Sequence, residues 1–460
     1  MEKALRKLPL IMALTASAVY LSLIFNDNVW VDEAFTAVLV RGSFKEMMAR
    51  SAADTLPPLY NILAWLMTEI FGYGTLQLKL TSVIPLISLF FFSAYKLTEL
   101  YNEKTAALYI FCLAAAPHML HYGVEIRMYS LCLSFTSVAA VYALEYCKKR
   151  SFRSLMFLCL FTLLSSFSHH YGLIALLFIW LDLAFFILIR DRSQIKPFLS
   201  AAVITALLHI PYLILTLYQI KNASSYFSSG DSPYSGFFSS LRFPFVTNIT
   251  PLSALLLAAV VFFAFFGSRV REGLALLTVY IEVLLLSYAM MIVTGRVFFT
   301  ARYLVPSLGL LWLGFSLSVC AGPLRLPVSR PKADKIAVLS VILLMTITAV
   351  TGYAMQFKEE YAPGVSQMLE FFDENLSPDD GYIIYESNYE IEWCMRYYEP
   401  SLIKYDPSDI ENIKGNIWYF EVPGFEKELD DNVLSTYNKV YKGAMSFDRY
   451  QFNLYELVRY

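Results

Sequence analysis

The sequence predicts a polytopic α-helical membrane protein that carries a small α/β domain at its C-terminal end. The chain has 460 residues, of which 57% are hydrophobic, and a mean hydropathy of +0.52. This composition is more apolar than that of a soluble domain, which excludes an ordinary water-soluble globule. Several apolar runs approach the roughly 18–20 residues that cross a bilayer. The last hundred residues contain no such run.

Charge divides the chain into two parts. From Lys358 onward there are 9 Lys and Arg against 21 Asp and Glu, whereas the preceding residues hold 27 against 17. We therefore expect a transmembrane region over residues 1–355 and an extracytoplasmic α/β domain over 356–460. Within this domain, the patterns predict strands at 382–386, 417–422 and 450–457, and a helix over 365–375.

Basic residues predict how the apolar region is threaded, because Lys and Arg collect on the cytoplasmic side. Lys3, Arg6 and Lys7 place the N-terminus in the cytoplasm. About eleven crossings then keep the later basic clusters inside and the acidic tail outside. The expected spans lie near 8–25, 78–98, 106–121, 129–146, 154–168, 172–189, 198–219, 251–267, 273–294, 303–320 and 335–355.

One apolar segment, residues 57–72, does not fit this threading as a span. Counting it as a crossing would place the basic cluster at 148–153 outside. Its length of about 16 residues suits a helix lying in the outer membrane interface. We therefore predict an outer interfacial helix here.

Ionisable and aromatic residues gather on the predicted outer side, next to the ends of the spans. Ionisable groups near a membrane core are costly and indicate a functional site. The alternative is that they are ordinary interfacial charges whose heads reach water. The candidates are Asp32, Glu33, Tyr60, Glu125, Arg127, Tyr129, His169, His170, Arg302 and Tyr303.

These residue types can transfer a group from a phosphate-bearing lipid. Asp32 can take a proton from an acceptor hydroxyl or amine as a general base. Arg127 and Arg302 can bind a phosphate and stabilise the charge that develops as it leaves. His169 or His170 can donate hydrogen bonds to the same phosphate or to a sugar.

Five short motifs, in order, resemble those of the GT-C glycosyltransferases, and most closely the branch with protein O-mannosyltransferases and the lipid A aminoarabinose transferase. They cover residues 1–310, and all lie on the predicted outer side. Leu56 stands where this family usually has His, so that position is given no role. The motifs are Val31-Asp32-Glu33-Ala34, Leu56-Pro57-Pro58-Leu59-Tyr60, Glu125-Ile126-Arg127-Met128-Tyr129, His169-His170-Tyr171 and Ala301-Arg302-Tyr303.

The resemblance implies a GT-C-like fold and transfer of a sugar from a polyprenyl-phosphate carrier to an extracytoplasmic acceptor. It assigns Asp32 as the base, Glu33 as its neighbour beside acceptor or donor, and Arg127 and Arg302 as phosphate binders. Glu125, Tyr129, Tyr60 and Tyr303 are expected to contact substrate. Protein, lipid, teichoic acid and polysaccharide acceptors all stay open. Besides these substrates the expected partner is the lipid bilayer, with no nucleic acid.

Other interpretations remain at this stage. A transporter or lipid flippase would place charged residues at mid-membrane, and Asp182 and Glu282 are the candidates for such a role. A membrane scaffold would explain the acidic tail but not the five motifs. No cofactor is expected; a divalent metal is conceivable if His121 and Glu125 join His169 and His170 in space.

Overall fold

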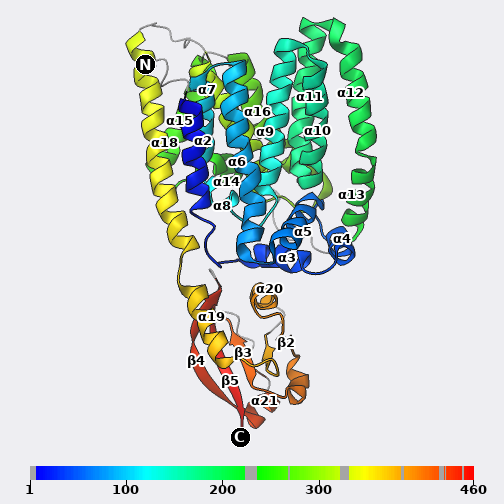
Figure 1. Ribbon diagram of the computed structural model, residues 1–460, viewed down its shortest axis with the longest axis vertical. Helices are drawn as coiled ribbons and strands as arrows, with labels where there is room; N and C mark the ends of the chain where they lie inside the picture. The colour runs from blue at the N-terminus through cyan, green and yellow to red at the C-terminus, as the bar shows by residue number, and fades with distance from the viewer. Residues whose placement is uncertain are drawn as a thin grey trace.

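The computed structural model describes residues 7–222, 236–267, 270–321, 331–384, 388–423, 429, 431–447 and 450–460. Lys3 and Arg6, on which the predicted orientation partly depends, lie outside these ranges. The described chain forms a long helical bundle with a smaller domain below one end (Figure 1). The first residues of α2 and the C-terminus lie toward opposite ends of the molecule (Figure 1).

The bundle consists of helices that run roughly along the long axis of the molecule (Figure 1). They are α2 (Leu8–Leu21), α6 (Thr75–Leu100), α7 (Glu103–Ala115), α9 (Tyr129–Lys149), α10 (Phe152–Ser168), α11 (His170–Arg190), α12 (Ile195–Leu208), α13 (Ile210–Asn222), α15 (Thr250–Phe266), α16 (Val270–Thr294), α17 (Val305–Cys320) and α18 (Pro331–Glu360). Two short helices, α8 (Met119–Tyr122) and α14 (Phe237–Arg242), complete this region.

The predicted membrane region is confirmed, but the number of eleven crossings is not. In the described residues, six helices are long and apolar enough to span, or up to eight if each of two bent helix pairs counts as one span. α2 and α7 have 14 and 13 residues. At 1.5 Å per residue each covers about 20 Å, less than a hydrocarbon core of roughly 30 Å. The expected span 8–25 extends past α2 because residues 23–25 are apolar but not helical, and the expected span 106–121 is interrupted at residues 116–118, between α7 and α8.

The centre of the bundle is formed by α9 and α17, whose apolar windows are 78% and 89% buried. The two helices approach closely at Gly309 of α17 and Ser137 of α9. A Cβ atom added to Gly309 would lie only 2.0 Å from the Ser137 hydroxyl oxygen, so no larger residue fits there. Small residues at such a contact are typical of packed membrane helices. The outer helices α11 and α18 are mostly exposed and present large apolar side chains outward. This arrangement suits a bilayer environment.

Three helices form a layer at the end of the bundle that faces the smaller domain: α3 (Val31–Val40), α4 (Phe44–Ala53) and α5 (Leu59–Phe71) (Figure 1). α5 corresponds to the segment at 57–72 and lies in this layer rather than along the bundle. α3 begins directly after a short extended segment that follows α2. Its first turn therefore lies at the junction of the bundle and the smaller domain.

The smaller domain is a mixed α/β unit, as predicted. Its sheet has the order β2-β1-β3-β5-β4, with β1 parallel to β2 and β3, and β5 antiparallel to β3 and β4. The three predicted strands are found, but β2 and β4 were not predicted, and part of 382–386 lies outside the described residues. The elements are α19 (Gly364–Asn375), β1 (Gly381–Ile383), α20 (Tyr389–Tyr398), β2 (Ile403–Lys404), β3 (Ile417–Glu421), α21 (Asp431–Thr436), β4 (Tyr437–Phe447) and β5 (Tyr450–Arg459).

Candidate active site

The first turn of α3 carries Asp32 and Glu33, and the sequence sets where this helix begins. Glu33 is the third helical residue, and its Oε2 accepts a hydrogen bond from the Trp30 backbone N–H at 3.2 Å. This contact satisfies an N–H that the start of a helix would otherwise leave open. Two carboxylates in the first turn also suit the positive end of the helix dipole.

Asp32 is held by an arginine from a distant part of the chain. The Nη1 of Arg302 donates to Asp32 Oδ2 at 2.7 Å, and both side chains are about one quarter to one third exposed. Arg302 lies in a short 3-10 turn, Ala301–Leu304, directly before α17. Its guanidinium also lies over the Trp30 ring, 5.7 Å from the ring centroid. The Asp32 carboxylate is therefore oriented by a cation but still accessible.

Arg127 reaches the same helical turn from the loop between α8 and α9. Its Nη1 donates to the Thr36 hydroxyl at 2.8 Å and to the Asp32 backbone oxygen at 3.3 Å. Thr36 lies one helical turn after Asp32, so both contacts are on one face of α3. The structure thus brings together Asp32, Arg127 and Arg302, as the sequence predicted.

Five side chains around this turn have buried polar atoms without a hydrogen-bond partner among the described residues. Such atoms are rare in folded proteins, because burying an unpaired polar group is costly. Here they come from three segments of the chain that meet beside Asp32. The atoms are Arg127 Nε, Arg302 Nε, Tyr129 OH, His169 Nε2 and both carboxyl oxygens of Glu125. This cluster of open donors and acceptors is suited to a polar, anionic ligand.

The two buried glutamates differ in their contacts. Burial raises the pKa of Glu33 to about 7, although nearby Lys79 lowers it. Its Oε1 accepts from the Ile126 backbone N–H at 2.7 Å, so Glu33 joins α3 to the loop that carries Arg127. Burial, with the neighbouring Glu33 charge, raises the pKa of Glu125 well above its usual value. The same burial therefore favours the protonated form of Glu125 more than water would.

Glu33 and Glu125 also line a small cavity of about 20 Å³, together with Trp30, His121 and Gln356 among others. This volume holds roughly one water molecule. The described residues contain no group of three or more His, Cys, Asp or Glu arranged to hold a metal. His121 and Glu125 therefore do not join His169 and His170 in a metal site.

The two histidines of the predicted phosphate-binding set have different environments. His169 Nδ1 accepts from the Tyr171 backbone N–H at 3.0 Å, which leaves Nε2 as the open donor. Burial lowers its pKa well below the usual value, so the ring is neutral. His170 contacts Tyr212 OH at 2.5 Å and the Thr55 carbonyl at 3.0 Å through its two nitrogens. His170 thus ties α11 to the chain after α4 and has no open ring nitrogen.

The predicted tyrosines also separate into two groups. The Tyr129 hydroxyl belongs to the open cluster, and the Tyr303 ring lies 5.1 Å from the His169 ring. Tyr60 instead pairs with the Ser82 hydroxyl at 2.7 Å, and Ser82 donates to the Glu125 carbonyl at 2.5 Å. Tyr60 thus supports the loop that carries Arg127, and Ser82 is the hydrogen-bond partner of its hydroxyl.

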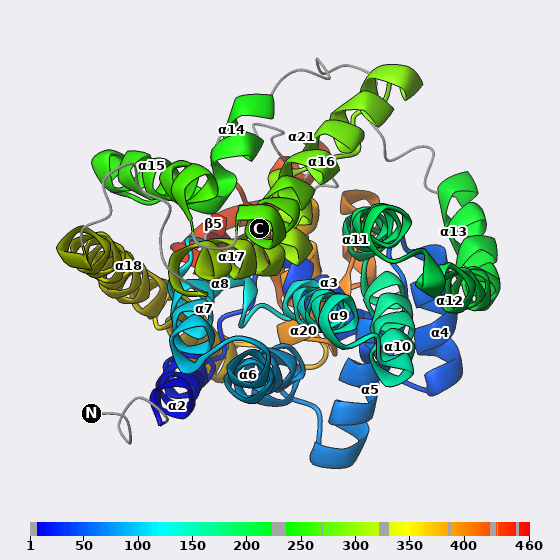
Figure 2. The same cartoon turned by 90° about the horizontal axis from the view of Figure 1, so that it is seen from above.

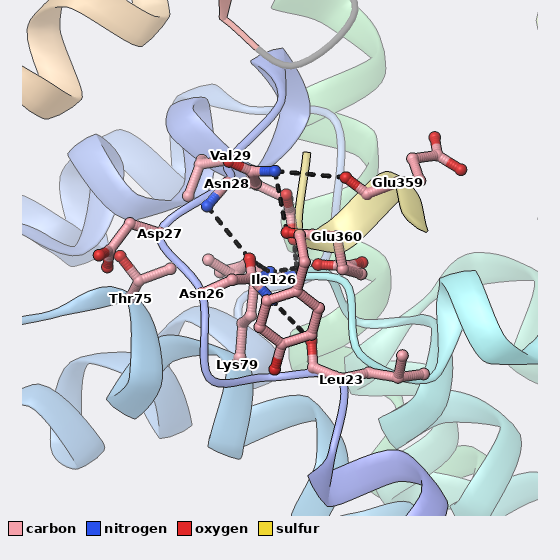
Figure 3. Close-up of polar contacts among 12 residues, drawn as sticks. Leu23, Asn26, Asp27, Asn28, Val29, Thr75, Lys79, Ile126, Glu359 and Glu360 are labelled. Atoms are coloured by element: carbon pink, nitrogen blue, oxygen red, sulfur yellow. Dashed lines mark hydrogen bonds and ion pairs between the residues drawn. The ribbon is translucent and has the colours of Figure 1, made fainter. Parts of the chain in front are cut away.

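Sequence reasoning missed the residues that fix the segment before α3 (Figure 3). Lys79 is 1% exposed, and its Nζ lies 2.7 Å from both Glu360 Oε2 and Asn26 Oδ1. Asn28 donates from Nδ2 to the Glu360 carbonyl at 2.9 Å. Lys79 stands in an apolar run, and this position could have indicated a buried charge that needs a partner. Nothing in the sequence pointed to its partner, which is 281 residues away.

The smaller domain holds the same segment from the other side. Tyr398, at the end of α20, donates its hydroxyl to the Asp27 carbonyl at 2.6 Å and accepts from the Val29 N–H at 3.0 Å. The Trp393 ring of α20 packs edge-on against Phe35 of α3, with centroids 4.9 Å apart. The first turn of α3 is therefore fixed by the bundle and the domain together.

Asp182 and Glu282, the candidates for a transport role, lie within α11 and α16. Each has one buried carboxyl oxygen without a hydrogen-bond partner in the described chain. Asp182 is twelve residues from His170, or about 18 Å along the helix. The structure therefore does not place these carboxyl groups in the cluster around Asp32.

Comparisons with known proteins identify the fold. No protein-family model matches the sequence, and no curated protein matches it. Among solved structures, ArnT from Cupriavidus metallidurans bound to undecaprenyl phosphate has a TM-score of 0.64 at 14% identity, with 97% of each chain covered. The apo form of the same protein also gives 0.64, at 13% identity. The arabinofuranosyltransferase AftD from Mycobacteria gives 0.56 at 11% identity, over 99% of this chain and 40% of that one.

These structures are glycosyltransferases with the GT-C fold, and this chain shares that fold. The prediction of a GT-C-like architecture is therefore confirmed. At 11–14% identity the likeness concerns the fold alone, so the activity has to be argued from the site.

Proposed function

We propose that this protein is an integral membrane glycosyltransferase that moves a sugar from a polyprenyl-phosphate carrier to an extracytoplasmic acceptor. The observation that carries the proposal is the set of buried, unpaired polar atoms around Asp32. A phosphate and a sugar would supply the partners that these atoms lack. That the domain-bearing end of the bundle is the extracytoplasmic one stays a prediction from the basic loops.

The donor phosphate is bound by Arg127, Arg302 and His169. Each keeps an N–H without a partner among the described residues, and both arginines are permanently charged. Charge-assisted hydrogen bonds to phosphate are among the strongest in proteins. They strengthen further as the phosphate leaves and gains charge, which lowers the barrier to transfer.

Asp32 is the general base. One carboxylate oxygen takes the proton of the acceptor hydroxyl or amine, while the acceptor atom forms a bond to the anomeric carbon. The bond from that carbon to the phosphate oxygen breaks, and its electron pair leaves with the polyprenyl phosphate. A single displacement of this kind inverts the anomeric configuration. The contact to Arg302 orients the carboxylate for the proton transfer.

The remaining predicted site residues divide into substrate contacts and supports. The Glu125 carboxyl group and the Tyr129 hydroxyl offer hydrogen bonds to the sugar or phosphate, and Tyr303 offers an aromatic face. Glu33, Tyr60 and His170 have their polar atoms paired with protein groups. We assign these three to positioning the site.

The fold supports this assignment, since the solved ArnT structure with the same architecture is bound to undecaprenyl phosphate. That ligand is a polyprenyl phosphate, the carrier class proposed for this chain. The acceptor and the sugar are not specified by the residues described above.

The proposal is tested by mass spectrometry of lipids that co-purify with the protein in mild detergent. We expect Asp32→Asn to retain a polyprenyl-phosphate sugar that the wild type turns over, because the variant binds donor but lacks the base. Asp182→Asn is the matched control and should resemble the wild type. The proposal is wrong if added polyprenyl phosphate binds neither protein more tightly than a bulk phospholipid does.

A further inference from the structure

A second site lies at the opposite end of the bundle from Asp32, between α18 and the helices α2, α7 and α17. A groove of about 780 Å³ is open there. Figure 2 shows α18 at the periphery of the bundle, with α2 and α7 beside it. The volume is in the range of binding sites for small organic ligands.

Two helices line the groove with the same pattern of residues. On α7 the lining residues are Lys104, Ala107, Leu108 and Phe111, and on α18 they are Lys335, Val338, Leu339, Ile342 and Thr346. Counted from the lysine, the others follow at positions +3, +4 and +7, and on α18 also at +11, so each set forms one continuous helix face. On both helices the lysine comes first, at the end where the helix starts, and mainly apolar side chains follow.

The groove therefore has a cationic mouth and an apolar interior. Lys104 and Lys335 are exposed, and no hydrogen bond or ion pair is found for either one in the described chain. Among the residues that the structure describes, the lining includes no acidic side chain. From Lys335 to Thr346 the stripe extends about 16 Å along α18, roughly half of a hydrocarbon core. These dimensions correspond to one leaflet.

We propose that this groove binds an anionic glycerophospholipid. Its anionic headgroup, with the phosphate, lies between Lys104 and Lys335, and an acyl chain lies along the apolar stripes of α7 and α18. The two ammonium groups without carboxylate partners select an anionic headgroup over a zwitterionic one. The lipid fills the space between α18 and the bundle, and the site is independent of the proposed sugar transfer.

The test measures lipid binding to the delipidated full chain by native mass spectrometry. Phosphatidylglycerol is compared with phosphatidylcholine carrying identical acyl chains. The variant Lys104→Gln/Lys335→Gln removes both charges from the mouth, and Lys196→Gln removes an exposed charge that does not line the groove. We expect the double variant to lose roughly tenfold in phosphatidylglycerol affinity, with phosphatidylcholine binding unchanged and Lys196→Gln equal to wild type.

A third variant tests the apolar part. Ile342→Trp fills the groove with a larger side chain while leaving both lysines, and it should weaken binding of both lipids. Thermal melting in detergent checks that each variant is folded. Unchanged phosphatidylglycerol affinity in the double variant overturns the proposal. So does equal affinity of the wild type for the two lipids, or displacement of phosphatidylglycerol by an equal concentration of polyprenyl phosphate.

Discussion

The two ends of the helical bundle both carry buried or half-buried charges, but they satisfy them in different ways. At the end away from the smaller domain, Lys96, Glu99, Glu145 and Lys149 form a continuous network of ion pairs. Around Asp32, by contrast, five side chains keep buried polar atoms without a hydrogen-bond partner in the described part of the chain. The network at the far end pairs its own charges within the fold. The unpaired atoms around Asp32 cost stability unless a ligand supplies their partners.

The largest expected effect comes from removing the base. Asp32→Asn keeps the side-chain volume but cannot accept the acceptor proton, so transfer should fall at least 100-fold. Release of polyprenyl phosphate from the donor, measured in membranes that contain the native acceptor, reports this loss. Asp191→Asn, at the opposite end, serves as the matched control. Normal turnover by Asp32→Asn would contradict the assignment of Asp32 as the general base.

A second change tests whether the unpaired Nε–H groups bind the phosphate. Arg302→Lys keeps the positive charge but removes the Nε donor and the planar fork. We expect donor affinity to fall about 10-fold, as measured by titration of polyprenyl phosphate in native mass spectrometry. Arg153→Lys, outside the site, should bind like the wild type. If Arg302→Lys and the wild type bound the donor equally well, the positive charge alone would be sufficient for phosphate binding, and the Nε–H group would have no role in it.

The pH dependence of stability tests the environment of Glu33. Its pKa of about 7 in the folded state exceeds the ordinary 4.5, so the folded protein holds this proton more tightly than the unfolded chain does. The stabilisation is complete below pH 4.5 and is lost as the pH rises through 7, by on the order of 3 kcal/mol.

Melting temperatures between pH 5 and 8 measure this effect. The wild type should lose more stability over that window than Glu33→Gln, which cannot ionise. Glu370→Gln, an exposed position on α19, should keep the wild-type slope. Identical slopes for wild type and Glu33→Gln would contradict the raised pKa.

The smallest effect is expected in the ion-pair network at the end of the bundle away from the smaller domain. Lys149 is 42% exposed, and Glu145 keeps Lys96 as a partner when Lys149 is removed. Lys149→Ala should therefore cost at most about 0.5 kcal/mol and leave donor binding unchanged. Denaturation and the donor titration measure the two quantities. A clear loss of donor affinity would show that the two ends are not independent.

The sequence selected residues that the structure brings together, but it did not show which of their polar atoms are paired within the protein. Motif order and the charge of the loops selected Asp32, Arg127 and Arg302, and the structure brings all three to one helical turn. His170 and Tyr60 stand in equally suggestive motifs, yet their polar atoms are taken by Tyr212 and Ser82. Pairing between distant segments is a property of packing, and no local pattern reports it.

By itself, the sequence determined the membrane class and the small α/β domain, because hydropathy, charge and residue patterns act over whole segments. The GT-C-like fold was predicted from the resemblance of five ordered motifs to a known family. Only the tertiary structure decided how many helices are long enough to span and which polar groups stay unpaired. It also decided that Lys79 pairs with Glu360 across 281 residues. These features depend on where helices end and which faces meet, and both are set by packing of the complete chain.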